Sequence, residues 1–106
     1  MKKGILAFSC FGLLLAIRLP MPAADAKKGE SVFENCAVCH NSDSTEVKIG
    51  PGLKGLFKRE KLVTGKPVNE KNVLDLIDTG SNAMPPFADA LSKEEKENVV
   101  AYLKTL

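Results

Sequence analysis

Residues 36 to 40 have the sequence CAVCH, which is the strongest indication of fold and function in the chain. It holds the only histidine of the 106-residue chain and two of its three cysteines. Two cysteines three residues apart can bind a metal, form a redox-active dithiol or attach a cofactor covalently. The surrounding sequence has to distinguish between these three kinds of site.

The N-terminus has the layout of a secretory signal peptide. Lys2 and Lys3 precede an apolar run over residues 5–17, and prolines and small residues follow it. The run is 13 residues long, whereas a membrane-spanning helix needs ~20. We therefore predict a cleavable leader, residues 1–26, and one mature domain, residues 27–106, with retention of the leader as an anchor as the alternative. The third cysteine, Cys10, lies in the leader.

The net charge of the predicted mature domain is zero. The whole chain has 15 basic and 13 acidic residues, and the leader takes away three basic residues and one acidic residue, which leaves 12 of each. Net charge therefore gives no support to nucleic-acid binding. Residues 48–66 hold six basic residues and one acid, whereas residues 70–97 hold seven acids and three lysines. We expect a dipolar molecule.

The mature chain predicts an all-α fold with no strand. A first helix starts near Lys27 and runs into the CAVCH motif, and the Ser, Asp, Thr, Gly and Pro residues of 41–55 predict a loop. One short helical segment is expected within residues 55–63. A mature domain of 80 residues is near the size at which one apolar core is barely sufficient, so we expect a further internal support for the fold.

Two further helices are predicted in the second half. One follows Asn69, a good N-cap, and ends at Gly80, and the other starts at Ser92 and runs to the chain end. Glu95 completes a capping box with Ser92. Between these helices lies the loop SNAMPPF, in which two prolines prevent a helix and hold Met84 on a restrained backbone.

Three of the alternatives for CAVCH explain it incompletely. A structural zinc site needs four ligands, and the mature chain has no other cysteine or histidine. A thioredoxin-like dithiol follows a strand in a βαβ unit, which this sequence lacks. A plain disulfide between Cys36 and Cys39 suits an exported protein, but it leaves His40 and the small core unexplained.

Haem attachment explains all five positions. Both cysteines can form thioethers with the vinyl groups of one haem, and the histidine that follows is then placed as an axial iron ligand. Since Met1 and Met21 lie in the leader, Met84 is the only methionine of the mature chain. We therefore predict His40 and Met84 as the two iron ligands. A lysine, an asparagine or an open position are the alternatives to Met84.

These features resemble the small bacterial class I cytochromes c over residues 27–106. The matching stretches are CAVCH, IGPGLKGLF at 49–57, GSNAMPPF at 80–87, Gly29 with Phe33, and the last helix with Tyr102. The resemblance implies the class I cytochrome c fold, in which three to five short helices wrap around one haem c bound covalently through Cys36 and Cys39.

The resemblance also implies roles for residues outside CAVCH. The carbonyl of Pro51 would accept the ring N–H of His40, and Gly29 would let the first helix cross the last near Phe33 and Tyr102. The segment FENC is one residue shorter between the aromatic and the first cysteine than in many members. This difference predicts a shifted helix angle, which counts against pairing of Phe33 with Tyr102. No residue is assigned to the haem propionates.

The function implied is that of a monomeric periplasmic electron carrier, not an enzyme, which passes single electrons between redox partner proteins. An acidic partner surface could dock on the basic segment, whose candidate residues are Lys54, Lys58, Arg59 and Lys61. Two alternatives are a haem subunit of a larger oxidoreductase and a protein with loosely held Met84 that binds ligands or turns over peroxide. No membrane span is expected after cleavage of the leader.

Overall fold

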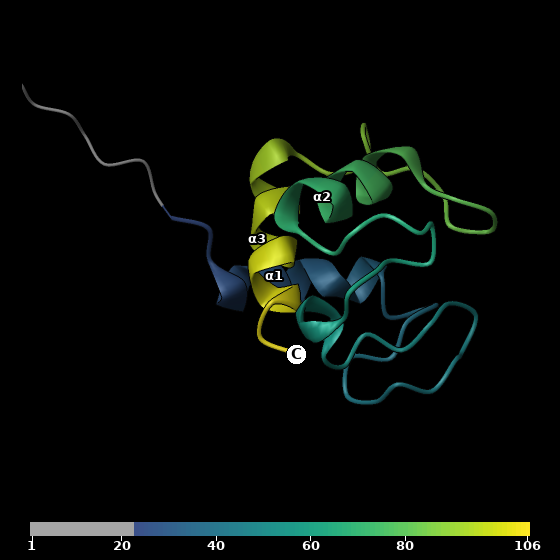
Figure 1. Cartoon of the computed structure of the whole chain (residues 1–106). Helices are drawn as coiled ribbons and strands as arrows, with labels where there is room; N and C mark the ends of the chain where they lie inside the picture. The colour runs from purple at the N-terminus through teal and green to yellow at the C-terminus, as the bar shows by residue number, and fades with distance from the viewer. Residues whose placement is uncertain (1–22) are drawn as a thin grey trace, which may run out of the picture.

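The computed structural model describes residues 23–106, and these residues form a helical fold (Figure 1). In this part of the chain, three α-helices and two 3₁₀ helices follow one another: α1 (Ala26–Val32), η2 (Phe33–Asn35), η3 (Leu56–Lys58), α2 (Glu70–Thr79) and α3 (Lys93–Leu103). Within residues 23–106, β pairing is limited to two isolated bridges. The all-α prediction is confirmed, and residues 1–22 of the predicted leader lie outside the described part.

The helix ends follow the capping signals of the sequence. The Asn69 side chain accepts a hydrogen bond from the Asn72 N–H at the start of α2, and Gly80 ends this helix with φ of 69°. Ser92 and Glu95 form the predicted capping box at the start of α3. One boundary differs from the prediction, because α3 ends at Leu103 and the last residues form a turn.

Helices α1 and α3 cross each other (Figure 1), and Gly29 of α1 lies against Asn98 of α3. A Cβ atom on Gly29 would lie 1.9 Å from the backbone oxygen of Asn98, so only glycine permits this crossing. Beside it the rings of Phe33 and Tyr102 pack with their centroids 5.4 Å apart. The short FENC segment predicted that Phe33 and Tyr102 would not pair, and this prediction is wrong. The 3₁₀ turn η2 gives the physical reason, because its tighter winding changes the path of the chain between α1 and Cys36.

The start of α1 is fixed by Asp25. Its carboxylate accepts hydrogen bonds from the N–H groups of Lys27 (2.8 Å) and Lys28 (3.2 Å), which makes it the N-cap. Its own N–H donates to the buried side chain of Asn98, over 2.7 Å. Asp25 and Ala26, which the sequence assigns to the leader, therefore take part in the fold.

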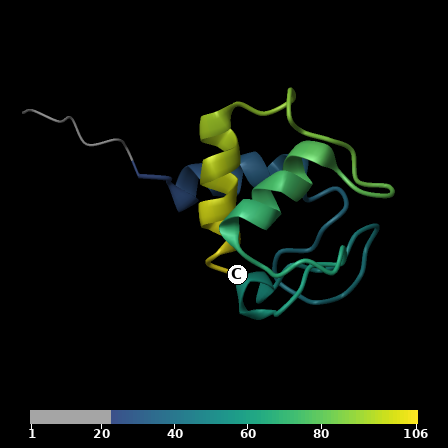
Figure 2. The same ribbon diagram turned by 45° about the horizontal axis from the view of Figure 1, so that its top comes forward.

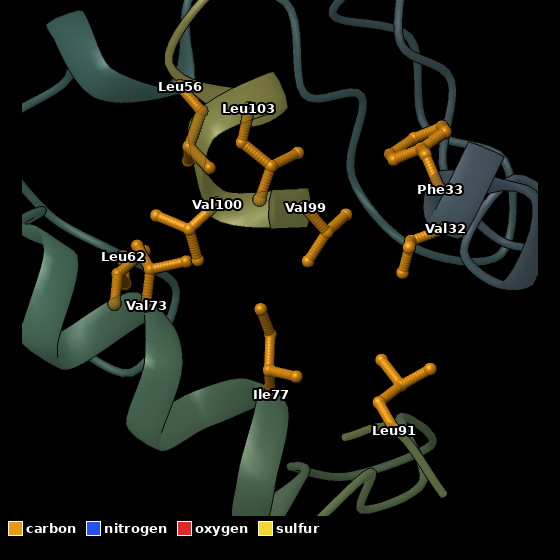
Figure 3. Close-up of a cluster of buried hydrophobic side chains, with 10 residues drawn as sticks. All are labelled: Val32, Phe33, Leu56, Leu62, Val73, Ile77, Leu91, Val99, Val100 and Leu103. Atoms are coloured by element: carbon orange, nitrogen blue, oxygen red, sulfur yellow. The ribbon is translucent and has the colours of Figure 1, made fainter. Parts of the chain in front are cut away.

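The apolar core lies between α3 and the elements packed around it (Figure 3). Val99 and Val100 are its most buried side chains, each with 1% of its surface exposed. The remaining core residues are Val32, Phe33, Leu56, Leu62, Val73, Ile77, Leu91 and Leu103. The loop over residues 81–90 and the loop over residues 41–50 extend on the same side of the molecule in Figures 1 and 2. Residues of both loops, Met84 and Gly50 among them, line the cavity described next.

Candidate cofactor site

A cavity of about 380 Å³ lies next to the core, and the predicted site residues line it together. Cys36, Cys39 and His40 come from the CAVCH motif, Pro51 comes from the loop that follows, and Met84 comes from the loop between α2 and α3. Most of the remaining wall is apolar, with side chains such as Leu53, Leu56, Leu62, Val73, Leu76, Ile77 and Phe87. A large flat apolar group fits such a cavity.

The CAVCH motif continues the helical path of η2 as a series of turns. The N–H groups of Ala37 and His40 donate to the carbonyls of Phe33 (2.9 Å) and Cys36 (2.9 Å). Cys36 and Cys39 form no disulfide, and both are partly buried. Burial, together with the neighbouring Cys39, raises the pKa of the Cys36 thiol to about 11. Reactive dithiols instead have lowered thiol pKa values, so this environment does not suit thiol-disulfide exchange.

The ring of His40 is fixed by a hydrogen bond and by a close packing contact. Its Nδ1–H donates to the carbonyl oxygen of Pro51 over 2.7 Å, and a carbonyl can only accept, so Nδ1 carries the proton. The lone pair of Nε2 then remains for a metal. Gly50 packs against the ring, where an added Cβ atom would lie 2.5 Å from His40 Cε1 and 2.9 Å from Nδ1. The sequence resemblance implied the Pro51 hydrogen bond but gave no role to Gly50.

The Met84 loop is a tight turn attached to α2. Ser81 and Met84 exchange backbone hydrogen bonds of 3.1 and 2.7 Å. Asn82 adopts a left-handed conformation with φ of 51°, and Gly80 has φ of 69°. A Cβ atom on Gly80 would lie 2.4 Å from the Met84 oxygen. The Met84 thioether is a weak acceptor and no donor, so backbone geometry and packing alone determine where its sulfur lies.

Two cationic residues also line the cavity, Arg59 and Lys61. The guanidinium of Arg59 donates from Nη2 to the carbonyls of Gly52 (2.7 Å) and Lys54 (2.8 Å), and the residue is half-buried. The sequence interpretation placed Arg59 on a docking surface, because one isolated arginine in a basic segment gives no signal of a buried role. A haem carries two carboxylates, so a mainly apolar cavity with two cations on its wall fits this cofactor.

The cavity residues can be compared with the ligand sets of known metal and cofactor sites. Within residues 23–106, no group of three or more His, Cys, Asp or Glu residues is arranged to hold a metal ion. Two cysteines next to a histidine with an available Nε2, and a methionine on the wall of the same apolar cavity, match the residues that hold the haem of a c-type cytochrome.

Comparisons with known proteins agree with this class. The family model described as "Cytochrome C oxidase, cbb3-type, subunit III" matches residues 24–103. Cytochrome c6 of Thermosynechococcus vestitus is 32% identical over 106 residues, covering 97% of this chain and 91% of the relative. Cytochrome c2 of Rhodospirillum rubrum is 31% identical and covers 100% of this chain and 99% of the relative. The solved structure of cytochrome c6 from the diatom Phaeodactylum tricornutum gives a TM-score of 0.62 and 34% identity, over 76% of this chain and 92% of that one.

The chain belongs to the family of small class I cytochromes c. Its cofactor is one haem c, attached covalently through Cys36 and Cys39. It is an electron carrier that acts with redox partner proteins, and it is not an enzyme. The alternative of a subunit in a larger oxidoreductase is not favoured, because the relatives c6 and c2 are covered over nearly their whole length. Among residues 23–106, no helix is both long and apolar enough to cross a membrane.

Proposed function

We propose that His40 and Met84 are the two axial ligands of the haem iron and that Pro51 orients His40. The hydrogen bond from His40 Nδ1 to the Pro51 carbonyl is the observation that carries this proposal. It fixes the tautomer that leaves Nε2 as the ligand atom, on the wall of a cavity that Met84 also lines. Two protein ligands would fill both axial positions, which counts against substrate binding at the metal.

The residues around this site suit electron transfer without rearrangement. The cofactor supplies reversible one-electron exchange at its iron. The soft thioether of Met84 would favour the ferrous state, and the apolar wall would exclude water, so both raise the reduction potential. His40 is held by a hydrogen bond and by Gly50, so its ring would move little between the two oxidation states.

An acidic partner would dock on the basic segment. Lys54, Lys58 and Lys61 are exposed, and Lys61 also lines the cavity. The guanidinium of Arg59 is bonded to two backbone carbonyls of the segment, so Arg59 supports the segment rather than facing a partner. We therefore assign docking to the three lysines alone. Charge steering of this kind is screened by salt. Electron-transfer rates with an acidic partner protein should fall as salt is raised, and rates independent of salt would contradict the docking proposal.

The mature protein would act as a monomer in the periplasm after removal of its leader. The cap formed by Asp25 favours a cut on the N-terminal side of this residue over the predicted cut after Ala26, because the later cut would remove the cap of α1. The intact mass of the exported protein distinguishes the two positions. A mass that corresponds to the uncleaved chain would instead support the anchor alternative.

Absorption spectroscopy of the purified protein tests the proposed ligands. We expect a pyridine haemochrome spectrum of the thioether-bound type, which the double variant Cys36→Ala, Cys39→Ala should lose. The oxidised protein should show the weak red absorption band of methionine sulfur bound to ferric iron. Met84→Ala should lose this band while it keeps covalent haem, and a band that survives in Met84→Ala would overturn the assignment.

A further inference from the structure

The loop that carries Met84 leaves and rejoins the fold at the last turn of α2. The Phe87 N–H donates to the Ile77 carbonyl over 2.8 Å, and the Ala88 N–H donates to the Asp78 carbonyl over 3.3 Å. The chain before the loop and the chain after it are thus bonded to each other at one junction. The position of the Met84 sulfur depends on this junction, because the thioether itself makes no strong hydrogen bond.

One lysine of α3 binds both sides of this junction. Nζ of Lys96 lies 2.7 Å from Asp78 Oδ1 and donates to the Ala88 carbonyl over 3.4 Å. Asp78 precedes the loop in α2, and Ala88 follows it. The cation also lies near the C-terminal end of α2, where the helix dipole favours positive charge. Lys96 therefore connects α3 to both ends of the Met84 loop.

The burial of Lys96 distinguishes it from the other paired lysines. Its side chain is 15% exposed, whereas the side chains of Lys71, Lys93 and Lys104 in their ion pairs are 82%, 84% and 47% exposed. Exposed ion pairs contribute little because water and salt screen them. A partly buried, charge-assisted hydrogen bond contributes more.

We propose that Lys96 is a positioning residue for Met84, which holds the loop junction closed through Asp78 and Ala88 and so keeps the sulfur on the iron. This inference rests on the proposed role of Met84 as a ligand. Loss of the ammonium group loosens the junction and raises the fraction of molecules in which the sulfur has left the iron. An added ligand then competes with Met84 more successfully.

Binding of imidazole to the oxidised holoprotein measures this competition. Lys96→Met keeps the aliphatic stem but removes the charge, and Lys104→Met is the matched control because Lys104 also joins α3 to α2, through Glu70 at the other end of α2. We expect the apparent Kd of imidazole to fall about tenfold in Lys96→Met, from the loss of one charge-assisted hydrogen bond. The red band should weaken in the same variant. Lys104→Met should match the wild type, and Lys96→Arg should restore most of the wild-type Kd.

A double-mutant cycle separates positioning from general loss of stability. Asp78→Asn should tighten imidazole binding in the same direction, and it supplies the test if Lys96→Met gives no folded holoprotein. The double variant should bind imidazole no more tightly than the tighter of the two single variants, because both remove one interaction. Equal imidazole affinity in Lys96→Met and Lys104→Met would overturn the inference, and so would fully additive effects in the cycle. A wild-type protein without the red band would overturn the ligand role of Met84 instead.

Discussion

His40 and Met84 line one cavity, but the chain holds these two side chains by different means. The His40 ring is fixed directly, through its hydrogen bond to the Pro51 carbonyl and its close packing on Gly50. The Met84 side chain is fixed only indirectly, through a loop fastened to the end of α2 and to Lys96. The comparison shows that a ligand with a second polar atom can be oriented by its own side chain, whereas a thioether depends on the backbone that carries it.

The substitution Gly50→Ala disturbs the packing that fixes the His40 ring, and we expect it to have the largest effect on stability. The new Cβ atom would lie 2.5 Å from His40 Cε1, and the ring cannot move without losing its bond to Pro51. We expect a loss of about 3 kcal/mol in the free energy of unfolding and a low yield of holoprotein. Urea denaturation and the haem content of the purified protein measure these effects. Gly65→Ala is the control: Gly65 has φ of 90° and no atom within 4 Å, so this variant carries backbone strain but no clash and should keep its haem content. Equal losses of stability and haem in both variants would refute a special role for Gly50.

The substitution Gly80→Ala disturbs the loop that carries Met84 and leaves the contacts of His40 unchanged. Gly80 has φ of 69°, and a Cβ atom there would lie 2.4 Å from the Met84 oxygen. We expect a loss of about 2 kcal/mol in stability and a weakened or absent red band, with covalent haem unchanged. Gly55→Ala is a matched control, because Gly55 has a similar φ of 72° and no atom within 4 Å. Retention of the red band in both variants would refute the role of Gly80 in placing Met84.

The substitution Asp25→Ala weakens helix α1 but contacts neither His40 nor Met84, so it separates general stability from the two ligands. Loss of the N-cap of α1 should cost about 1 kcal/mol in stability. The red band and the haem spectrum should stay as in the wild type, because Asp25 contacts α1 and Asn98 rather than the cavity. Thermal denaturation beside Asp43→Ala, which changes an exposed loop carboxylate, measures the cost. No difference between these variants would show that the cap contributes nothing.

The substitution Pro51→Ala should have the smallest effect. The carbonyl that accepts the His40 proton belongs to the backbone and remains in the variant. We expect a loss of about 0.5 kcal/mol in stability, from the greater freedom of the unfolded chain, and an unchanged haem spectrum. If absorption spectra instead reveal a lost His40 ligand, the proline ring rather than its carbonyl positions the histidine.

The sequence predicted most of the fold because its signals are local. The caps at Asn69 and Ser92, the stop at Gly80 and the two prolines after Met84 act within one helical turn, and the structure has each of them. The chemistry of CAVCH was equally local, since the motif contains both thiols and the histidine. Family membership was predicted from these short stretches and is confirmed by the comparisons.

The features that the sequence did not predict depend on contacts between distant segments. The link from Lys96 to Asp78 spans 18 residues, and the bond from Asp25 to Asn98 spans 73. Neither pair has a spacing that marks it in the sequence. The half-buried position of Arg59 and the pairing of Phe33 with Tyr102 are of the same kind, because each depends on how the chain is packed rather than on its local pattern.

Denaturation of the oxidised protein, followed by two signals in one titration, tests the central claim most directly. The red band reports whether Met84 is bound to the iron, and far-ultraviolet circular dichroism reports the helices. We expect the oxidised protein to show the red band. We also expect the band to disappear at a lower urea concentration than the helical signal, because the Met84 loop opens before the core unfolds. A protein with no such band, or a band that is lost in the same transition as the helices, would contradict the claim.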